Sequence, residues 1–246
     1  MNSKRWIIWF GVSLVILAVG LHFLHFLIFR DAHHVLIYLL GDIAFVPLEV
    51  LLVTLVLHQV LANRERRSRL HKMNMVIGAF FSEVGADFIR RISRLESSGS
   101  PPPQLQVRQE WTAKDYAAAR KFAARRKAQI TLDRESAGDL REFLLQRRTF
   151  LLRLLENPHL LEHEVFTDLL WAVLHLAEEL AARTDPAALP DSDLEHLSGD
   201  VERAYGRVLR EWLAYMNHLR KDYPYLYSLA IRLNPMASEP SPIVTQ

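Results

Sequence analysis

Two long apolar stretches near the N-terminus constrain this 246-residue chain more than any other feature. They run from Trp6 to Phe29 and from Val35 to Leu61, and only Arg30 to His34 separates them. Each stretch exceeds the ~20 residues that a helix needs to cross a hydrocarbon layer of ~30 Å, and the short connection leaves room for a tight turn. The pattern predicts a two-helix transmembrane hairpin in residues 1–62, with helices over about 6–29 and 35–61.

Basic residues flank the outer ends of this hairpin. Lys4 and Arg5 precede the first stretch, and the connecting turn holds one Arg and one Asp. The basic residues after the second stretch are Arg64, Arg66, Arg67, Arg69 and Lys72. The positive-inside rule then places both termini in the cytoplasm, and the basic residues after the hairpin become candidates for contact with lipid headgroups. We expect a multi-pass protein of the cell membrane.

Three polar side chains interrupt the apolar stretches: His22, Asp42 and Glu49. A charge at mid-bilayer costs at least ~2.5 kcal/mol, so these residues need a partner or a watery surrounding. Folding the hairpin about Ala32 brings Asp42 level with His22 and leaves Glu49 level with Val15. Two helices have too little surface to shield both acids, so we expect a homo-oligomer in the lipid bilayer.

Composition excludes several classes of function. The formal net charge of +2 gives no argument for nucleic-acid binding. The absence of Cys removes disulfides, thiolate metal sites and thiol catalysis. No nucleotide-binding loop, dinucleotide turn, nucleophile elbow or zincin helix is present. We expect no cofactor and no nucleic-acid partner.

The sequence after the predicted hairpin indicates helices and no strands. Residues 63–96 form a basic juxtamembrane segment and then an amphipathic helix that begins near Met73, and the Ser, Gly and Pro residues of 97–111 predict a linker. Helices are expected at about 112–130, 136–155, 158–183, 191–221 and 223–233. Capping boxes are expected at the start of the first two, from Thr112 with Asp115 and from Ser136 with Asp139. Strand signals are absent, so we predict an all-α fold in which a cytoplasmic helical bundle spans 112–234 and a disordered tail spans 235–246.

The basic run from Arg120 to Lys127 has three interpretations. A solvated helix face is the commonest state of such a run, and we favour it. Contact with lipid headgroups is the alternative that the membrane tether suggests. Nucleic-acid binding would require aromatic stacking positions beside a basic groove, and Phe122 alone does not supply them.

A stripe of acids and histidines marks the helix expected at 158–183. It holds Glu164, Asp168, Trp171, His175 and Glu178 or Glu179, opposite Val165, Leu169, Val173, Leu176 and Leu180. The next helix carries His196 and Asp200 one turn apart. Di-iron bundles use converging acids and imidazoles, but they need a Glu-x-x-His pair on each of two helices. Here Glu156 to His159 straddles the Asn157-Pro158 break, so we favour a polar network over a metal site at Glu164, Asp168, His175, Glu178, His196 and Asp200.

The segments 157–164 (NPHLLEHE), 168–171 (DLLW) and 223–230 (YPYLYSLA) resemble a group of uncharacterised prokaryotic inner-membrane proteins. Members of this group combine two membrane helices with a cytoplasmic helical domain. The resemblance covers most of the chain, and it implies membrane location without a named activity. It carries no functional residues over to this sequence.

Three classes of function remain open. The first and favoured class is a non-enzymatic oligomeric membrane anchor, scaffold or signalling module. The second is an ion or proton channel lined by Glu49, Asp42 and His22. The third is a membrane-tethered helical metalloenzyme that uses the stripe of acids and histidines.

Overall fold

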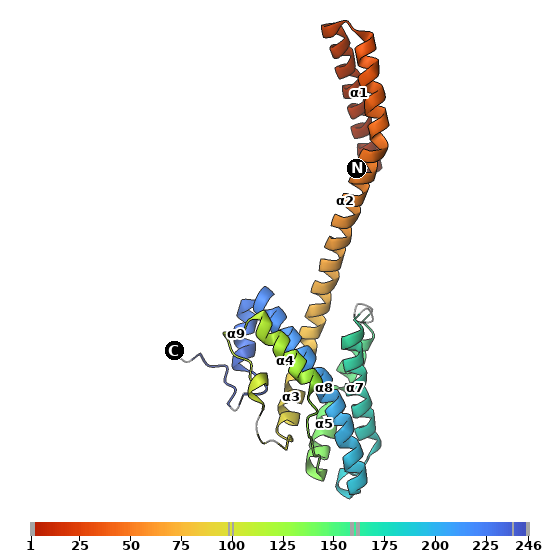
Figure 1. Cartoon of the computed structure of the whole chain (residues 1–246). Coiled ribbons are helices and arrows are strands. Elements are labelled where there is room, and N and C mark those ends of the chain that lie inside the picture. The colour runs from red at the N-terminus through yellow and green to blue at the C-terminus, as the bar shows by residue number, and fades with distance from the viewer. Residues whose placement is uncertain are drawn as a thin grey trace. The chain divides into compact units, whose positions relative to one another are not determined.

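Figure 1 shows a computed structural model of the chain, which describes residues 3–97, 99, 101–157, 160, 163–237 and 239–244. For residues 3–5, 7, 34 and 66–72 the description covers the backbone alone. The described part is helical and holds no strand, apart from an isolated bridge between Glu96 and Ile130. This confirms the all-α fold class, with two apolar helices followed by a helical domain.

The chain divides into two compact units, Met1–Arg66 and Arg67–Gln246. Short 3-10 turns lie at Pro103–Leu105 and Pro186–Ala188. The longer elements are α1 (Ser3–Phe29), α2 (Ala32–Phe80), a π-helical turn (Phe81–Gly85), α3 (Ala86–Ser93), α4 (Ala113–Arg125), α5 (Arg134–Leu155), α7 (Glu164–Ala182), α8 (Asp191–Asp222) and α9 (Pro224–Arg232).

The first unit is a helical hairpin in which α1 and the first part of α2 run in opposite directions (Figure 1). Its connection is shorter than expected, because only Arg30 and Asp31 lie between the helices. Arg30 has a φ of 50°, the left-handed conformation in which helices commonly end, and its N–H donates to the carbonyl of Phe26 at 2.8 Å. The centre of the hairpin therefore precedes Ala32. This shift moves Asp42 away from the level of His22, where we had expected it.

Apolar side chains cover the outside of this first unit. The stretches Ile8–Phe29 and Val35–Glu65 are long and apolar enough to cross a membrane, and neither is buried within the protein. Trp9 is 69% exposed and Leu40 is 71% exposed. Monomeric soluble proteins rarely expose so large a contiguous apolar surface, so this surface needs a covering environment.

The helix α2 continues through the basic segment to Phe80, whereas we expected a separate amphipathic helix from Met73. The physical reason is that Asn63 to Lys72 contains no Gly or Pro and consists mostly of good helix formers. The interruption comes later, at the π-helical turn, where the N–H of Ala86 donates to the carbonyl of Phe81. After this turn α3 continues to Ser93.

Gly85 lies where the π-helical turn packs most tightly. A Cβ at this position would be 2.8 Å from Cε1 of Phe80 and closer still to the ring of Phe81. Both rings are buried, at 0% and 3% exposed, so they have no free space to move into. We expect Gly85→Ala to lower the free energy of unfolding by about 1–3 kcal/mol, the usual cost of an overpacked core. Urea unfolding of the full chain in detergent, followed by circular dichroism, measures this loss.

Gly206→Ala is the matched control for that experiment. Gly206 lies inside α8, and a Cβ there would meet nothing within 4 Å. Alanine is favoured over glycine inside a helix by about 0.5–1 kcal/mol, so this variant should be slightly more stable than the wild type. If both variants gained stability equally, the tight packing around Gly85 would be disproved.

The second unit is a bundle in which α7 packs between α5 and α8, and α4 packs on α8 (Figure 1). The buried face of α7 includes the residues that the helical spacing predicted, Leu169, Val173, Leu176 and Leu180, and also Leu170, Leu174 and Ala177. Val165, expected on the same face, is 55% exposed. In the first turn of α7 the buried position belongs to Phe166, which is 0% exposed.

Capping side chains decide where the helices of the bundle begin. The predicted capping box of Thr112 and Asp115 is present at the start of α4. At α5 the box consists of Asp133 and Ser136, whereas we expected Ser136 and Asp139. The helix α5 therefore starts about one turn earlier than the sequence indicated, because the side chain of Asp133 accepts a hydrogen bond from the N–H of Ser136 at 2.7 Å.

The helix expected from Pro158 begins at Glu164 in the described residues. Nδ1 of His163 accepts the N–H of Phe166 at 3.0 Å, which satisfies a free donor of the first turn. A histidine in this role is not among the residues that sequence rules prefer at a helix start. The expected start at Pro158, and His159 beside it, lie outside the described residues.

Two segments that we expected to be a linker and a disordered tail carry side chains into the core. Leu105 and Val107 are 0% and 6% exposed, and Met236 is 3% exposed. The side chain of Asn234, directly before the expected tail, donates to the carbonyl of Val107 at 3.4 Å, which joins this end of the bundle to the expected linker. The prolines and serines predicted the irregular backbone, but they did not indicate that the apolar side chains between them would be buried.

Candidate functional site

Two pairs of side chains meet where α7 packs against α8. The helix α7 carries His175 and Glu179, and α8 carries His196 and Asp200. A spacing of four residues places the members of each pair on one face of their helix, one turn apart. We call these four residues the histidine–carboxylate cluster.

The distances within the cluster are short. Oδ2 of Asp200 lies 3.5 Å from Nε2 of His175 and 3.7 Å from Nε2 of His196. Glu179 is nearly as close, with Oε1 at 3.9 Å from Nε2 of His175 and Oε2 at 4.0 Å from Nε2 of His196. One ligand atom from each of His175, Glu179 and Asp200 can be chosen so that all three lie within 4.8 Å of one another.

The cluster has a buried base and an open rim. Asp200 is 3% exposed, and its Oδ2 is buried without a hydrogen-bond partner. The side chains of His175 and His196 are 50% and 57% exposed. Solvent therefore reaches the imidazole rings, while the free oxygen of Asp200 faces them from the protein side.

Arginines also bind both carboxylates of the cluster. Arg203 donates to Oδ1 of Asp200 at 2.7 Å, and Arg183 donates to Oε2 of Glu179 at 2.7 Å. The hydrogen bond from Arg183 lowers the pKa of Glu179, and the nearby histidines lower it further. Glu179 is therefore ionised at neutral pH. Arg183 also donates to Asp193, which lies one turn before the cluster on α8.

The structure brings together three of the six metal candidates that the sequence offered, namely His175, His196 and Asp200. The sequence left Glu178 and Glu179 as alternatives, and Glu179 is the one in the cluster, because it lies four residues after His175. The remaining candidates are exposed and lie outside the cluster: Glu164, Asp168 and Glu178. The sequence pattern that identifies this cluster is a His-x-x-x-acid pair on each of two helices. It differs from the Glu-x-x-His pair of di-iron bundles.

The polar candidates of the first unit are all on its surface. His22, Asp42 and Glu49 are exposed, and Pro47 lies between the two acids inside α2. Among the candidates for headgroup contact, Arg64 is exposed. The side chains of the others lie outside the described residues: Arg66, Arg67, Arg69 and Lys72.

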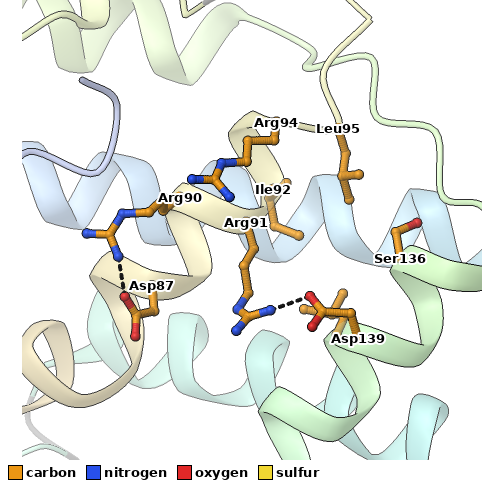
Figure 2. A pocket seen from close by; sticks show the side chains of 9 residues that line it. Asp87, Arg90, Arg91, Ile92, Arg94, Leu95, Ser136 and Asp139 are labelled. Carbon is orange, nitrogen blue, oxygen red and sulfur yellow. Dashed lines mark hydrogen bonds and ion pairs between the residues drawn. The ribbon is translucent and has the colours of Figure 1, made fainter. Parts of the chain in front are cut away.

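A pocket of about 320 Å³ lies between α3 and the start of α5 (Figure 2). Arg91 of α3 forms an ion pair with Asp139 of α5, and Arg90 pairs with Asp87 on its own helix. Arg94 and Ser136 also line the pocket. Two of the three guanidinium groups are thus paired with carboxylates, which fits a contact between helices better than a site for an anionic ligand.

Comparison with known proteins assigns the chain to a family. Two family profiles match it: "MJ1433, N-terminal helical domain" over residues 2–61 and "Uncharacterized protein MJ1433, C-terminal helical domain" over residues 69–232. The chain is 43% identical over 236 residues to the uncharacterized protein MJ1433 of Methanocaldococcus jannaschii, and the alignment covers 96% of this chain and 95% of that protein. No solved structure matches the chain.

These matches confirm the resemblance to an uncharacterised family that has no named activity. They also divide the chain where the apolar helices give way to the bundle. The chain therefore belongs to the MJ1433 family, which joins an N-terminal helical domain to a C-terminal helical domain.

Proposed function

We propose that this protein is an integral membrane anchor whose N-terminal hairpin tethers a cytoplasmic helical domain. The observation that carries the proposal is the exposure of apolar side chains along both candidate spans, Ile8–Phe29 and Val35–Glu65. The hydrocarbon core of a bilayer covers such surfaces, and each helix satisfies its own backbone hydrogen bonds there. A two-residue connection suits a hairpin that crosses the bilayer twice.

The distribution of charge supports one orientation. Lys4 and Arg5 precede the first span, and the basic segment that begins with Arg64 follows the second. The connection between the spans holds one Arg and one Asp, so it has no excess of positive charge. By the positive-inside rule both termini and the bundle are cytoplasmic, and the turn faces the other side.

Self-association follows from the acids of the second span. Asp42 and Glu49 are exposed on a single copy of the hairpin, seven residues apart and therefore on one helix face. Each charged side chain near the bilayer centre costs about 2.5–3.5 kcal/mol on insertion scales. Contacts between copies would shield this face, which supports an oligomer over a monomer.

Thiol labelling tests the proposed topology directly. The chain contains no Cys, so a single introduced Cys is its only thiol. In intact cells, a membrane-impermeant maleimide should label Ala32→Cys, at the start of α2 beside the turn, and should label Ser97→Cys only after the membrane is permeabilised. Both variants should remain in the membrane fraction after extraction at alkaline pH.

Three results would contradict the proposal. Release of the protein by alkaline extraction would show that the hairpin does not cross the bilayer. Labelling of Ser97→Cys in intact cells would reverse the orientation. A single copy per micelle, measured by light scattering in mild detergent, would remove the oligomer and leave Asp42 and Glu49 without a protein partner.

A further inference from the structure

We propose that the histidine–carboxylate cluster binds a divalent first-row transition metal such as Zn²⁺. The ligands are Nε2 of His175, Oε1 of Glu179 and Oδ2 of Asp200, and His196 lies beside them. The proposal concerns the bundle alone and does not depend on the membrane anchor. A bound ion would join α7 to α8 through ligands from both helices.

Three ligand atoms are already close together, because one atom each of His175, Glu179 and Asp200 lies within 4.8 Å of the other two. In a tetrahedral zinc site the ligand atoms lie about 3.3 Å apart, because each is ~2.0–2.1 Å from the zinc ion. Nε2 of His175 lies 3.5 Å from Oδ2 of Asp200 and 3.9 Å from Oε1 of Glu179. The three atoms would therefore have to move closer together by side-chain rotation to hold an ion.

The free oxygen of Asp200 is a separate argument for a cation. A buried carboxylate oxygen that accepts no hydrogen bond is costly, since it has lost its water without gaining a donor. Oδ2 of Asp200 is in this state, while Oδ1 is held by Arg203. The free oxygen is the atom closest to both imidazoles, so an ion at the centre of the cluster would satisfy it.

The arginines act as supports for the ligands. Metal-binding carboxylates are commonly fixed by hydrogen bonds to the oxygen that does not face the metal. Arg203 makes such a bond to Oδ1 of Asp200, and Arg183 donates to Oε2 of Glu179, which leaves Oε1 for the ion; both bonds are 2.7 Å long. These contacts set the orientation of both carboxyl groups before any ion arrives, which reduces the entropy lost on binding.

The donor set selects the class of metal. Imidazole nitrogen suits Zn²⁺, Fe²⁺, Co²⁺ and Ni²⁺, whereas Mg²⁺ and Ca²⁺ prefer sites built only of oxygen. The half-exposed rings of His175 and His196 leave a path for the ion and space for a water ligand. We therefore expect zinc-class ions to bind and Mg²⁺ not to compete with them.

Metal analysis of the full chain in detergent tests this proposal. The protein is purified with an affinity tag that lacks histidine, stripped with a chelator, dialysed against Zn²⁺ and analysed by mass spectrometry for metal content. About one Zn²⁺ per chain is expected, with a rise in Tm of about 5 °C or more at saturating Zn²⁺ and no rise with Mg²⁺. Co²⁺ in place of Zn²⁺ should give visible absorption bands that report the ligands directly.

The variants separate ligation from folding. His175→Gln removes a half-exposed nitrogen ligand with little effect on the core, and it should weaken Zn²⁺ binding at least tenfold and change the Co²⁺ bands. Asp200→Asn should do the same, although it also alters the pair with Arg203. Glu178→Gln, next to the cluster but outside it, is the matched control and should bind Zn²⁺ as the wild type does.

Two outcomes would overturn the proposal. The first is a stripped wild-type protein that takes up no stoichiometric Zn²⁺ and shows no change in Tm. The second is equal Zn²⁺ binding by His175→Gln and Glu178→Gln, with circular dichroism showing that both are folded. Either result would leave the cluster as a network of ion pairs between α7 and α8.

Discussion

Arg126→Met should lower the free energy of unfolding of the bundle by about 3–5 kcal/mol, the usual cost of removing one partner of a buried ion pair. Arg126 donates to both oxygens of Glu96, at 2.8 and 2.7 Å. The side chain of Glu96 is 0% exposed and that of Arg126 is 18% exposed. Hydrogen bonding to Glu96 raises the pKa of Arg126, so this arginine stays charged at any pH that the fold survives. The substitution would remove the guanidinium that binds both oxygens of this buried carboxylate.

The ion pair between Glu96 and Arg126 also joins the segment before α4 to the segment after it. Glu96 precedes the segment that leads into α4, and it forms a backbone bridge with Ile130, which follows the helix. Ser97 donates its N–H to the carbonyl of Gln129 at 3.1 Å beside it. Loss of Arg126 should therefore loosen this closure as well as destabilise the bundle. Urea unfolding of the full chain in detergent, followed by circular dichroism, measures the change, because the apolar hairpin stays helical in the micelle.

Arg125→Met is the matched control, since Arg125 is the exposed neighbour of Arg126. Its stability should lie within about 0.5 kcal/mol of the wild type. The double variant Glu96→Met with Arg126→Met should recover most of the loss, because both charges leave together. If Arg126→Met proved as stable as Arg125→Met, the pair would be making no net contribution to the bundle.

Phe166→Ala should cost about 3–5 kcal/mol of unfolding free energy, as is typical when a buried Phe is truncated. The ring is 0% exposed and meets the ring of Phe80 edge to face, with centroids 5.4 Å apart and planes at 87°. Such aromatic pairs contribute about 0.5–1.5 kcal/mol beyond the burial of their surface. Phe80 is the last residue of α2 and α7 begins two residues before Phe166, so the contact fixes the end of α2 within the bundle.

Val165→Ala provides the control one residue away. Val165 is 55% exposed in the same turn of α7, so its truncation should change the stability by about 0.5 kcal/mol or less. The same urea titration compares the two variants under identical conditions. An equal effect of both substitutions would mean that the first turn of α7 does not pack on Phe80.

In the basic run from Arg120 to Lys127, the sequence predicted the exposure of most side chains but not the ion pair that Arg126 makes. The composition favoured a solvated helix face, and Arg120, Lys121, Arg125 and Lys127 are indeed exposed. Arg126 is different, because it pairs with Glu96. Nothing in the local spacing distinguishes Arg126 from its neighbours, since its partner lies thirty positions earlier in the chain.

The sequence determined the features that depend on local composition and periodicity. The apolar spans, the all-α class, the capping box at Thr112 and the buried face of α7 from Leu169 to Leu180 follow from hydrophobicity, helix spacing and hydrogen bonding within a few residues. The two i, i+4 pairs of the histidine–carboxylate cluster were also visible, because a helix fixes which residues share a face. The sequence could not say which faces of two helices meet.

Tertiary structure alone decided the remaining features, because they depend on contacts between distant segments. It turned His175 and Asp200 toward each other across α7 and α8, and it left Oδ2 of Asp200 buried without a donor. It also buried Leu105 and Met236, in segments that composition marked as irregular. Burial and side-chain pairing are set by how helices pack, and helix packing depends on the shape of the whole core rather than on any short window of sequence.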